Sequence, residues 1–307
     1  MTTPRHLGIL LTARCNLTCR HCLQYRHFKH DLDPAFCKRL LREATHIGID
    51  RVSFSGGEPT LYPHLDEIVA LCLENKQGYS ITTNGTLYEP LLRAAMIHAP
   101  SHITISFEGA RRGIHDRVRG IGTYDKALQT ARLLIAAGIH VRVQCTLLST
   151  LLKEIESIEL LLDDTGADEL VLVPPIVTEN IVRDGQDPQI SNLINIQQWI
   201  AKYRAQGRIV SLALGDEIIS NNRPYGFIPC QYLRGESLFV DWMGKLALCC
   251  QTSGIALSER EVIGDLLQES LATLLERKKL WMNHFFRMRG EGSATFACSD
   301  CLKTLAY

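Results

Sequence analysis

Residues 15–22 read Cys15-Asn16-Leu17-Thr18-Cys19-Arg20-His21-Cys22 and directly follow the apolar run Leu7–Leu11. The three cysteines stand in the order Cys-x3-Cys-x2-Cys. Three thiolates on one short loop can hold three irons of a cubic iron–sulfur cluster and leave the fourth iron open to another ligand. A structural zinc site normally has four protein ligands, and no nearby fourth cysteine completes the set; His21 would ligate only with awkward geometry. The loop therefore favours an iron–sulfur cluster over zinc.

Four more polar segments stand at intervals along the first half of the chain. They are Ser55-Gly56-Gly57-Glu58-Pro59, Ser80-Ile81-Thr82-Thr83-Asn84-Gly85, Ile103-Thr104-Ile105-Ser106-Phe107-Glu108-Gly109 and His115-Asp116-x-x-Arg119-Gly120. In the first segment, two glycines allow the backbone to approach a ligand closely, and a carboxylate can pair with an ammonium group. Alone, this segment would read as an ordinary turn. Its distance from the cysteine loop makes a binding segment the better interpretation.

Together these segments, over roughly residues 6–175, resemble the radical S-adenosylmethionine (radical SAM) superfamily. The resemblance implies that Cys15, Cys19 and Cys22 hold a [4Fe–4S] cluster to which SAM binds. It implies that Glu58 pairs with the SAM amino group and Arg119 with the SAM carboxylate. Glu108 replaces a commoner Asp at a ribose contact. The cofactor-binding residues implied in this way are His21, Gly56, Gly57, Glu58, Asn84, Ser106, Glu108 and Arg119.

Strand-like apolar runs alternate with helical patterns, which is typical of βα units around a parallel sheet. The helix after the cysteine loop should begin with Asp33 as its N-cap and Pro34 at its first position, with apolar residues at Phe36, Leu40, Leu41, Ala44 and Ile47. Six strands are fewer than the eight of a closed barrel. The expected α/β fold is therefore a partial (β/α)6 TIM-like barrel, as the resemblance also implies. The strands are expected at Leu7–Leu11, Arg51–Ser55, Tyr79–Thr83, Ile103–Phe107, His140–Leu147 and Leu170–Val173.

A second group of cysteines lies in the last third of the chain, after a helix near Leu193–Ala205, a strand near Ile209–Leu214 and a turn-rich segment. We expect the barrel to span residues 1–222 and a small domain to span residues 223–307. The segment Gly244-x4-Cys249, with a turn at Met243-Gly244, resembles the twitch domain, a shortened SPASM domain with a β-hairpin and a helix. The resemblance implies one auxiliary [4Fe–4S] cluster, although the same four thiolates could also hold zinc. Its ligands would be Cys230, Cys249, Cys298 and Cys301.

Cys250 is left over from this ligand set. Free cysteine is often a small buried apolar residue, and that is the simpler interpretation. However, Gly-x4-Cys-Cys resembles radical SAM epimerases of aminoglycosides (neomycin-type) and of ribosomal peptides, in which a free thiol gives a hydrogen atom to the substrate radical. Cys250 is therefore the candidate catalytic residue. Cys37, Cys72 and Cys145 fall within helix or strand patterns and are expected in the core.

Composition limits the other classes of function. The 307 residues are 46% hydrophobic and 21% charged, with no apolar run long enough to span a bilayer and no signal peptide. Clustered metal-ligand cysteines in a chain of this size indicate a reducing cytoplasm. No basic patch or known motif suggests nucleic-acid binding. Residues 1–150 contain 18 Lys and Arg against 12 Asp and Glu. Residues 151–307 contain 15 Lys and Arg against 21 Asp and Glu. Solvated helix faces or a cationic substrate would each explain this asymmetry.

The resemblance implies chemistry in which a 5′-deoxyadenosyl radical, formed after electron transfer from a flavodoxin or ferredoxin, takes hydrogen from an unactivated carbon. We expect an epimerase in antibiotic biosynthesis that acts on an aminoglycoside or amino sugar. Possible amine partners are Asp216, Glu217, Glu236 and Asp241. A ribosomal-peptide epimerase is the alternative, although only 14 residues precede Cys15 and leave no room for a leader-binding domain. A twitch-type dehydrogenase of an aminocyclitol and a peptide-crosslinking enzyme are further possibilities.

Overall fold

The computed structural model describes residues 3–22, 29–173, 175, 185, 190–212, 230–249 and 262–290. The chain forms two compact units. The first unit comprises Met1–Cys15, Arg26–Tyr79 and Ile228–Tyr307, and the second comprises Asn16–Tyr25 and Ser80–Phe227. The boundary expected at residues 222–223 lies outside the described residues and stays a prediction.

The first unit combines strands from both ends of the chain in the order β10-β9-β8-β1-β2. Strand β1 pairs in parallel with β2 on one side and with β8 on the other. Strands β8, β9 and β10 are antiparallel, so the hairpin expected around Met243-Gly244 is confirmed. The bounds of these strands are β1 His6–Thr12, β2 Arg51–Gly56, β8 Ser237–Val240, β9 Lys245–Ala247 and β10 Val262–Asp265.

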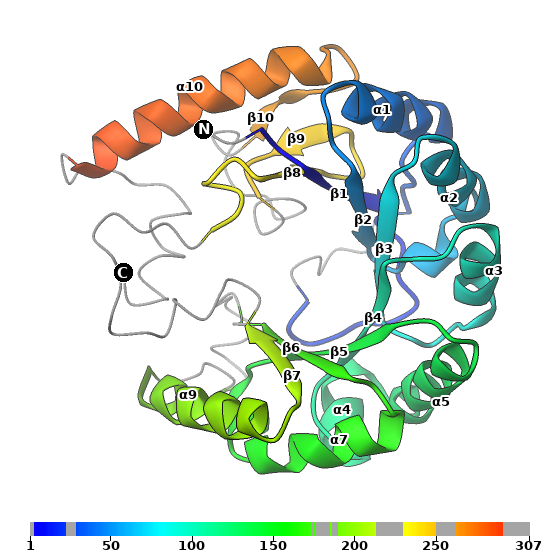
Figure 1. The fold of residues 1–307 in the computed structure, drawn as a ribbon, viewed down its shortest axis with the longest axis vertical. Helices are drawn as coiled ribbons and strands as arrows, with labels where there is room; N and C mark the ends of the chain where they lie inside the picture. The colour runs from blue at the N-terminus through cyan, green and yellow to red at the C-terminus, as the bar shows by residue number, and fades with distance from the viewer. Residues whose placement is uncertain are drawn as a thin grey trace. The chain divides into compact units, whose positions relative to one another are not determined.

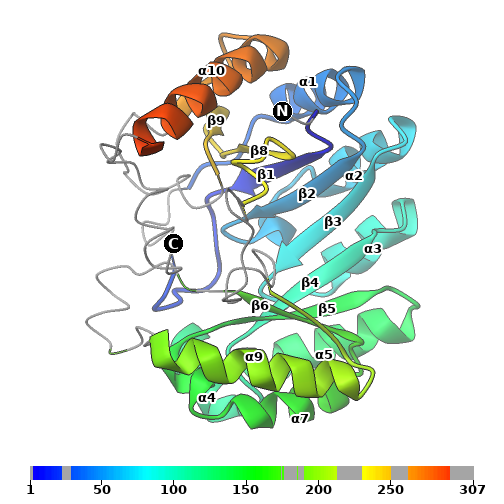
Figure 2. The ribbon, with the colours of Figure 1, turned by 60° about the vertical axis from the view of Figure 1, so that its left-hand side comes forward.

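Helices and a 3-10 turn complete the described part of the first unit: α1 Pro34–His46, η1 Pro59–Leu61, α2 Leu65–Glu74 and α10 Leu271–Gly290. Helix α1 begins as the sequence predicts, because the Asp33 side chain accepts a hydrogen bond from the Phe36 backbone N–H at 2.7 Å. Ile47 lies just past the helix, as its C-cap. Helix α10 lies beside α1 (Figures 1 and 2), where the Leu271 N–H donates to Glu43 at 2.9 Å.

The second unit is a parallel sheet in the order β3-β4-β5-β6-β7. Helices α5, α7 and α9 run along one face of its strands (Figures 1 and 2). The strands are β3 Gly78–Thr83, β4 His102–Phe107, β5 Val141–Thr146, β6 Glu169–Val173 and β7 Ile209–Leu212. The helices and turns are α3 Glu89–Ile97, α4 Arg112–Arg119, α5 Thr123–Ala136, α6 Ser149–Leu152, η2 Ile155–Ser157, α7 Ile158–Thr165 and α9 Ile190–Ala205.

All six strands expected from the sequence are present, each within one residue of its expected ends. The seventh expected strand begins at Ile209, and residues 213–214 lie outside the described part. Cys37, Cys72 and Cys145 are fully buried, as predicted. Within the described residues, no helix is both long enough and apolar enough to cross a bilayer.

Candidate cofactor site

The chain entering the cysteine loop is held by the segment that follows β2. The Gly57 N–H donates to the Thr12 carbonyl at 2.7 Å, and the Glu58 N–H donates to the Arg14 carbonyl at 2.7 Å. These bonds extend the β1–β2 pairing beyond the last strand residues. The backbone immediately before Cys15 is therefore fixed by the Gly-Gly-Glu segment.

This close approach explains both glycines. A Cβ atom on Gly57 would lie 2.2 Å from the Arg14 carbonyl oxygen, and one on Gly56 would lie 2.4 Å from the Thr12 carbonyl oxygen. Gly56 also has φ +148°, which side-chain-bearing residues rarely adopt. Within the first unit, the glycines make room for the cysteine loop's own backbone, a role that the sequence did not reveal.

The Arg14 side chain makes further contacts that hold the same loop. Its Nε lies 2.9 Å from Asp31 Oδ1 and its Nη2 lies 2.7 Å from Asp31 Oδ2, while Nη2 also donates to the Leu61 carbonyl at 2.6 Å. Thr12 Oγ1 donates to the same Asp31 carboxylate at 2.6 Å. The sequence analysis missed Arg14 and Asp31, because nothing in the spacing of the two residues marks them as partners.

Glu58 is completely buried. Its Oε1 accepts hydrogen bonds from the Thr60 backbone N–H at 3.1 Å and from Thr60 Oγ1 at 2.7 Å, so the side chain caps η1. Thr60 thereby fixes the direction of the carboxylate that was expected to meet the SAM amino group.

In the second unit, the start of the cysteine loop is tied to the end of β3. Asn84 Nδ2 donates to Asn16 Oδ1 at 2.8 Å, and Asn16 Nδ2 donates to Thr86 Oγ1 at 2.8 Å. Thr86 closes the triangle by donating to Asn84 Oδ1 from its backbone N–H at 2.9 Å and from its hydroxyl at 2.6 Å. Asn84 thus acts on the loop itself, through a partner located between Cys15 and Cys19.

Glu108 and Arg119, which the sequence assigned separately to SAM, are paired with each other. Arg119 Nε and Nη2 lie 2.9 Å and 2.6 Å from the same oxygen, Glu108 Oε1. His21 Nε2 lies 3.3 Å from that oxygen. The Glu108 N–H donates to His115 Nδ1 at 3.3 Å. The carboxylate therefore links β4, α4 and the cysteine loop.

Three buried polar atoms of this group have no hydrogen-bond partner among the described residues: His21 Nδ1, Glu108 Oε2 and His115 Nε2. His21 Nε2 faces a carboxylate and so carries the proton, which leaves Nδ1 as an acceptor. Ser106 on β4 is also buried, with 7% of its surface exposed. Two unsatisfied acceptors and one donor fit a ligand that carries amino and hydroxyl groups, as SAM does.

The thiols of the loop fit an iron–sulfur cluster in their chemistry. Cys15, Cys19 and Cys22 are half-buried. Burial raises the pKa of the Cys19 thiol to about 11, and the Arg119 charge opposes that rise. A bound metal would hold such a thiol in its deprotonated form. The described residues contain no group of three side chains already arranged around one metal ion.

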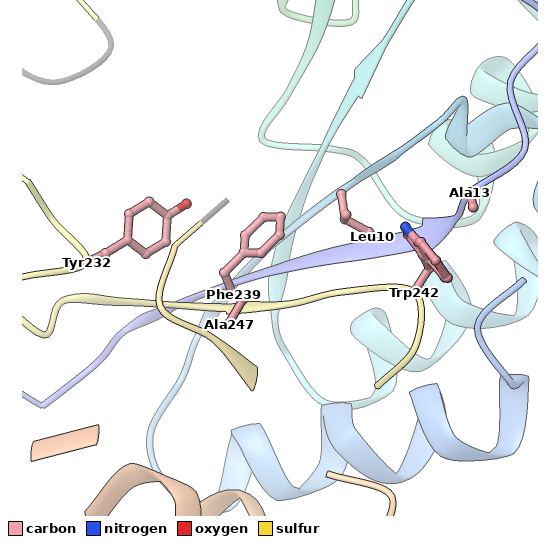
Figure 3. Packing of buried hydrophobic residues seen from close by; sticks show 6 residues of the cluster. All are labelled: Leu10, Ala13, Tyr232, Phe239, Trp242 and Ala247. Carbon is pink, nitrogen blue, oxygen red and sulfur yellow. The ribbon is translucent and has the colours of Figure 1, made fainter. Parts of the chain in front are cut away.

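Two members of the second cysteine group are described, and they lie against an apolar cluster of the first unit. The cluster is formed by Leu10, Ala13, Tyr232, Phe239, Trp242 and Ala247 (Figure 3). Both Cys230 and Cys249 pack on this cluster, although 19 positions separate them in the sequence. The β8–β9 hairpin, which pairs Phe239 with Ala247, lies between them in the chain. Two of the four expected auxiliary ligands therefore pack on the same apolar cluster. Cys298, Cys301 and the candidate donor Cys250 lie outside the described residues.

Comparison with known proteins identifies the two parts of this arrangement. Residues 9–164, just over half of the chain, match the family model for the Radical SAM superfamily. Residues 230–302 match SPASM, described as an iron-sulfur cluster-binding domain. The second match begins at Cys230 and ends one residue after Cys301.

Curated relatives match part of the chain. Mycofactocin maturase MftC of Mycobacterium tuberculosis is 33% identical over 132 residues, which cover 42% of this chain and 34% of that protein. PqqA peptide cyclase of Gluconobacter oxydans is 33% identical over 141 residues, covering 44% and 39%. The match thus spans less than half the length of these relatives.

Solved structures share the fold over most of the chain. SuiB of Streptococcus suis, bound to the precursor peptide SuiA, has a TM-score of 0.73 at 18% identity and covers 90% of this chain and 65% of its own. The structure titled anSMEcpe with bound AdoMet and Kp18Cys peptide has a TM-score of 0.70 at 16% identity, covering 90% and 82%. These likenesses show the TIM-like partial barrel with a C-terminal SPASM domain.

The cysteine motif, the Gly-Gly-Glu segment and the Glu108 segment all lie inside the first match. The chain therefore belongs to the Radical SAM superfamily, as an enzyme that uses S-adenosylmethionine and iron–sulfur clusters and carries a C-terminal SPASM domain.

Proposed function

We propose that the enzyme inverts a carbon centre of a peptide, with Cys250 as the hydrogen-atom donor. The observation that carries this proposal is the packing of Cys249, the residue before Cys250, on the apolar cluster just after β9. Ala247 and Cys249, two positions apart, pack on the same apolar cluster. Cys250 itself lies outside the described residues, and its role as donor is proposed from the Gly-x4-Cys-Cys sequence pattern.

The loop contacts give the chain's own residues their roles in this function. Cys15, Cys19 and Cys22 would hold the SAM-binding cluster, and Cys230, Cys249, Cys298 and Cys301 the auxiliary one. Arg14, Asp31 and Gly57 fix the loop before Cys15, and Asn16 with Asn84 fixes it after Cys15. Glu58 and Ser106 would bind SAM, as would His21, Glu108 and His115 through their unsatisfied polar atoms. When bound, SAM and the reduced cluster supply hydrogen-atom abstraction from an unactivated carbon.

In the inversion step, the S–H bond of Cys250 breaks and a C–H bond forms on the opposite face of the substrate carbon. The sulfur radical left on Cys250 takes up one electron and one proton to restore the thiol. A flavodoxin or ferredoxin would supply electrons, and the reducing cytoplasm is the compartment that we propose.

A peptide is favoured over an amino sugar by two observations. The relatives include a PqqA peptide cyclase, and SuiB is solved with a precursor peptide. The described acids expected to bind amines are also engaged within the protein. Glu236 makes two 2.9 Å hydrogen bonds with Arg234, and Asp241 Oδ1 accepts the Met243 and Lys245 N–H groups of its own turn.

The second candidate is epimerisation of an aminoglycoside or amino sugar. It is favoured by the acidic second half of the chain, where Asp and Glu exceed Lys and Arg by 21 to 15. Both candidates use the same donor and differ only in substrate.

The test is incubation with reductant, SAM and either peptides or aminoglycosides in deuterated water, followed by mass spectrometry. The wild type should place one deuterium in an inverted product, because thiol hydrogens exchange with solvent. Cys250→Ala should still form 5′-deoxyadenosine but no inverted product. Cys72→Ala, at a buried core thiol, is the matched control and should retain inversion. Inversion by Cys250→Ala would refute this donor, and a product two mass units lighter would instead identify a dehydrogenase.

A further inference from the structure

Glu108 and Arg119 form a nearly dry ion pair. Their side chains are 0% and 9% exposed, and two guanidinium nitrogens meet one carboxylate oxygen at 2.9 Å and 2.6 Å. Water does not screen charges placed in this way, so their fields extend to neighbouring groups more strongly than those of a surface pair.

The pair lies directly against the cysteine loop within the second unit. His21, between Cys19 and Cys22, lies 3.3 Å from Glu108 Oε1 through its Nε2. The Arg20 N–H donates to the carbonyl of Val118, the residue before Arg119, at 3.0 Å. The two residues that follow Cys19 therefore contact Val118, the neighbour of Arg119, and Glu108 itself.

His115 Nδ1 accepts the Glu108 N–H, and burial together with the Arg119 charge lowers the pKa of His115 to about 3, so this histidine is neutral and does not alter the charge of the pair. Arg119 and Glu108 balance each other as +1 and −1.

We infer that the Glu108–Arg119 pair sets the reduction potential of the cluster bound by Cys19 and its neighbours, as a balanced charge beneath the loop. This inference rests on the cysteine ligands of the proposed function. Reduction adds one negative charge to a cluster, so a nearby cation stabilises the reduced form and a nearby anion stabilises the oxidised form. Hydrogen bonds and charges outside the ligand shell are known means of tuning a metal site. Arg119 Nε and Nη2 both donate hydrogen bonds to Glu108. Arg119 therefore acts on the reduction potential of the cluster through its charge.

The test measures the midpoint potential of the reconstituted cluster by redox titration followed by electron paramagnetic resonance, without substrate. Glu108→Gln leaves the Arg119 cation unbalanced and should make the potential more positive. Arg119→Met leaves the Glu108 anion unbalanced and should make it more negative. The double variant should return close to the wild-type value. Shifts of the midpoint potential in opposite directions would show that the charges set the potential. A purely structural role would not make the direction of the shift follow the sign of the charge removed.

Two variants control for loss of structure. Arg119→Lys keeps the charge and should keep the potential near that of the wild type even if the protein melts at a lower temperature. Asp125→Asn breaks the exposed Arg112–Asp125 pair on the adjacent helices and should leave the potential unchanged. Single variants that shift in the same direction, or loaded variants that show no shift, would overturn the inference. A wild type that binds its clusters but forms no inverted product would contradict only the proposed function.

Discussion

Gly57 has no space for a side chain. The carbonyl oxygens of Arg14 and Ala13 would lie 2.2 Å and 2.8 Å from its Cβ, and both belong to backbone that cannot rotate away. One hydrogen atom at this position therefore determines how closely the Gly-Gly-Glu segment and the cysteine loop approach each other.

Replacing Gly57 with Ala should destabilise the loop by about 1–3 kcal/mol, the usual cost of overpacking. Lower iron content per chain after reconstitution and a lower melting temperature would show this. Gly113→Ala is the matched control, because a Cβ there meets nothing within 4 Å. Equal iron content in the Gly57 and Gly113 variants would contradict the steric argument.

Glu58→Gln separates the two roles of this side chain. The amide oxygen can still accept from Thr60, so the melting temperature should stay within about 1 °C of the wild type, since only the charge is lost. A charge-assisted bond to the SAM amino group contributes about 1.5–3 kcal/mol, so SAM affinity should fall roughly 10- to 100-fold. Calorimetric titration with SAM measures it. Unchanged affinity would remove Glu58 from the SAM site and leave it as the cap of η1.

At the scale of elements, local signals were read correctly. Asp33 and Pro34 mark the start of α1 because a cap and its partner lie three residues apart. Strand ends were predicted within one residue because apolar runs have visible limits. Contacts between residues far apart in the chain could not be predicted from the sequence. The sequence assigned Glu108 and Arg119 separately to SAM and did not show that the turn between β4 and α4 pairs them with each other. Nothing in the sequence marked Asp31 as the partner of Arg14.

His6 connects three strands of the first unit. Its Nε2 lies 2.9 Å from Ser53 Oγ on β2, and its Nδ1 lies 3.1 Å from Ser237 Oγ on β8. Since the Ser237 hydroxyl donates to Gln231, it accepts from Nδ1–H, and Nε2 accepts from Ser53. This directional chain requires neutral imidazole. Burial, helped by Arg51, lowers the pKa of His6 to about 4.

The unfolded chain protonates this histidine near pH 6.5 and the folded chain near pH 4, so the unfolded state binds more protons between these values. Stability should therefore fall as the pH drops through this window, by about 2 kcal/mol from pH 7 to pH 5 for His6 alone. Thermal melts across this range should show a shallower pH dependence for His6→Gln. His46→Gln, on an exposed helix end, should keep the wild-type slope. Identical slopes for both variants would refute the role of His6.

At the scale of the whole molecule, the two cysteine groups should bind separate clusters, about eight irons per chain in total. Cys230→Ala or Cys249→Ala should reduce iron to about half while SAM binding persists, because the first group is intact. Replacing Cys15, Cys19 and Cys22 should remove SAM cleavage and the other half of the iron. Anaerobic metal analysis measures both results. Stoichiometric zinc in place of iron would contradict this assignment.

The pairing of β1 with β8 has a consequence for the order in which the protein is made. Strand β1 leads into the cysteine loop, but its neighbour β8 is synthesised more than 220 residues later. During translation, one edge of β1 remains uncovered until Ser237–Val240 leaves the ribosome. Until then, the apolar cluster to which Ala13 belongs also lacks Phe239 and Trp242. The segment leading into the first loop therefore reaches its final packing only after β8 has been made. Cys15, Cys19 and Cys22 must stay reduced throughout that interval if they are to bind a cluster.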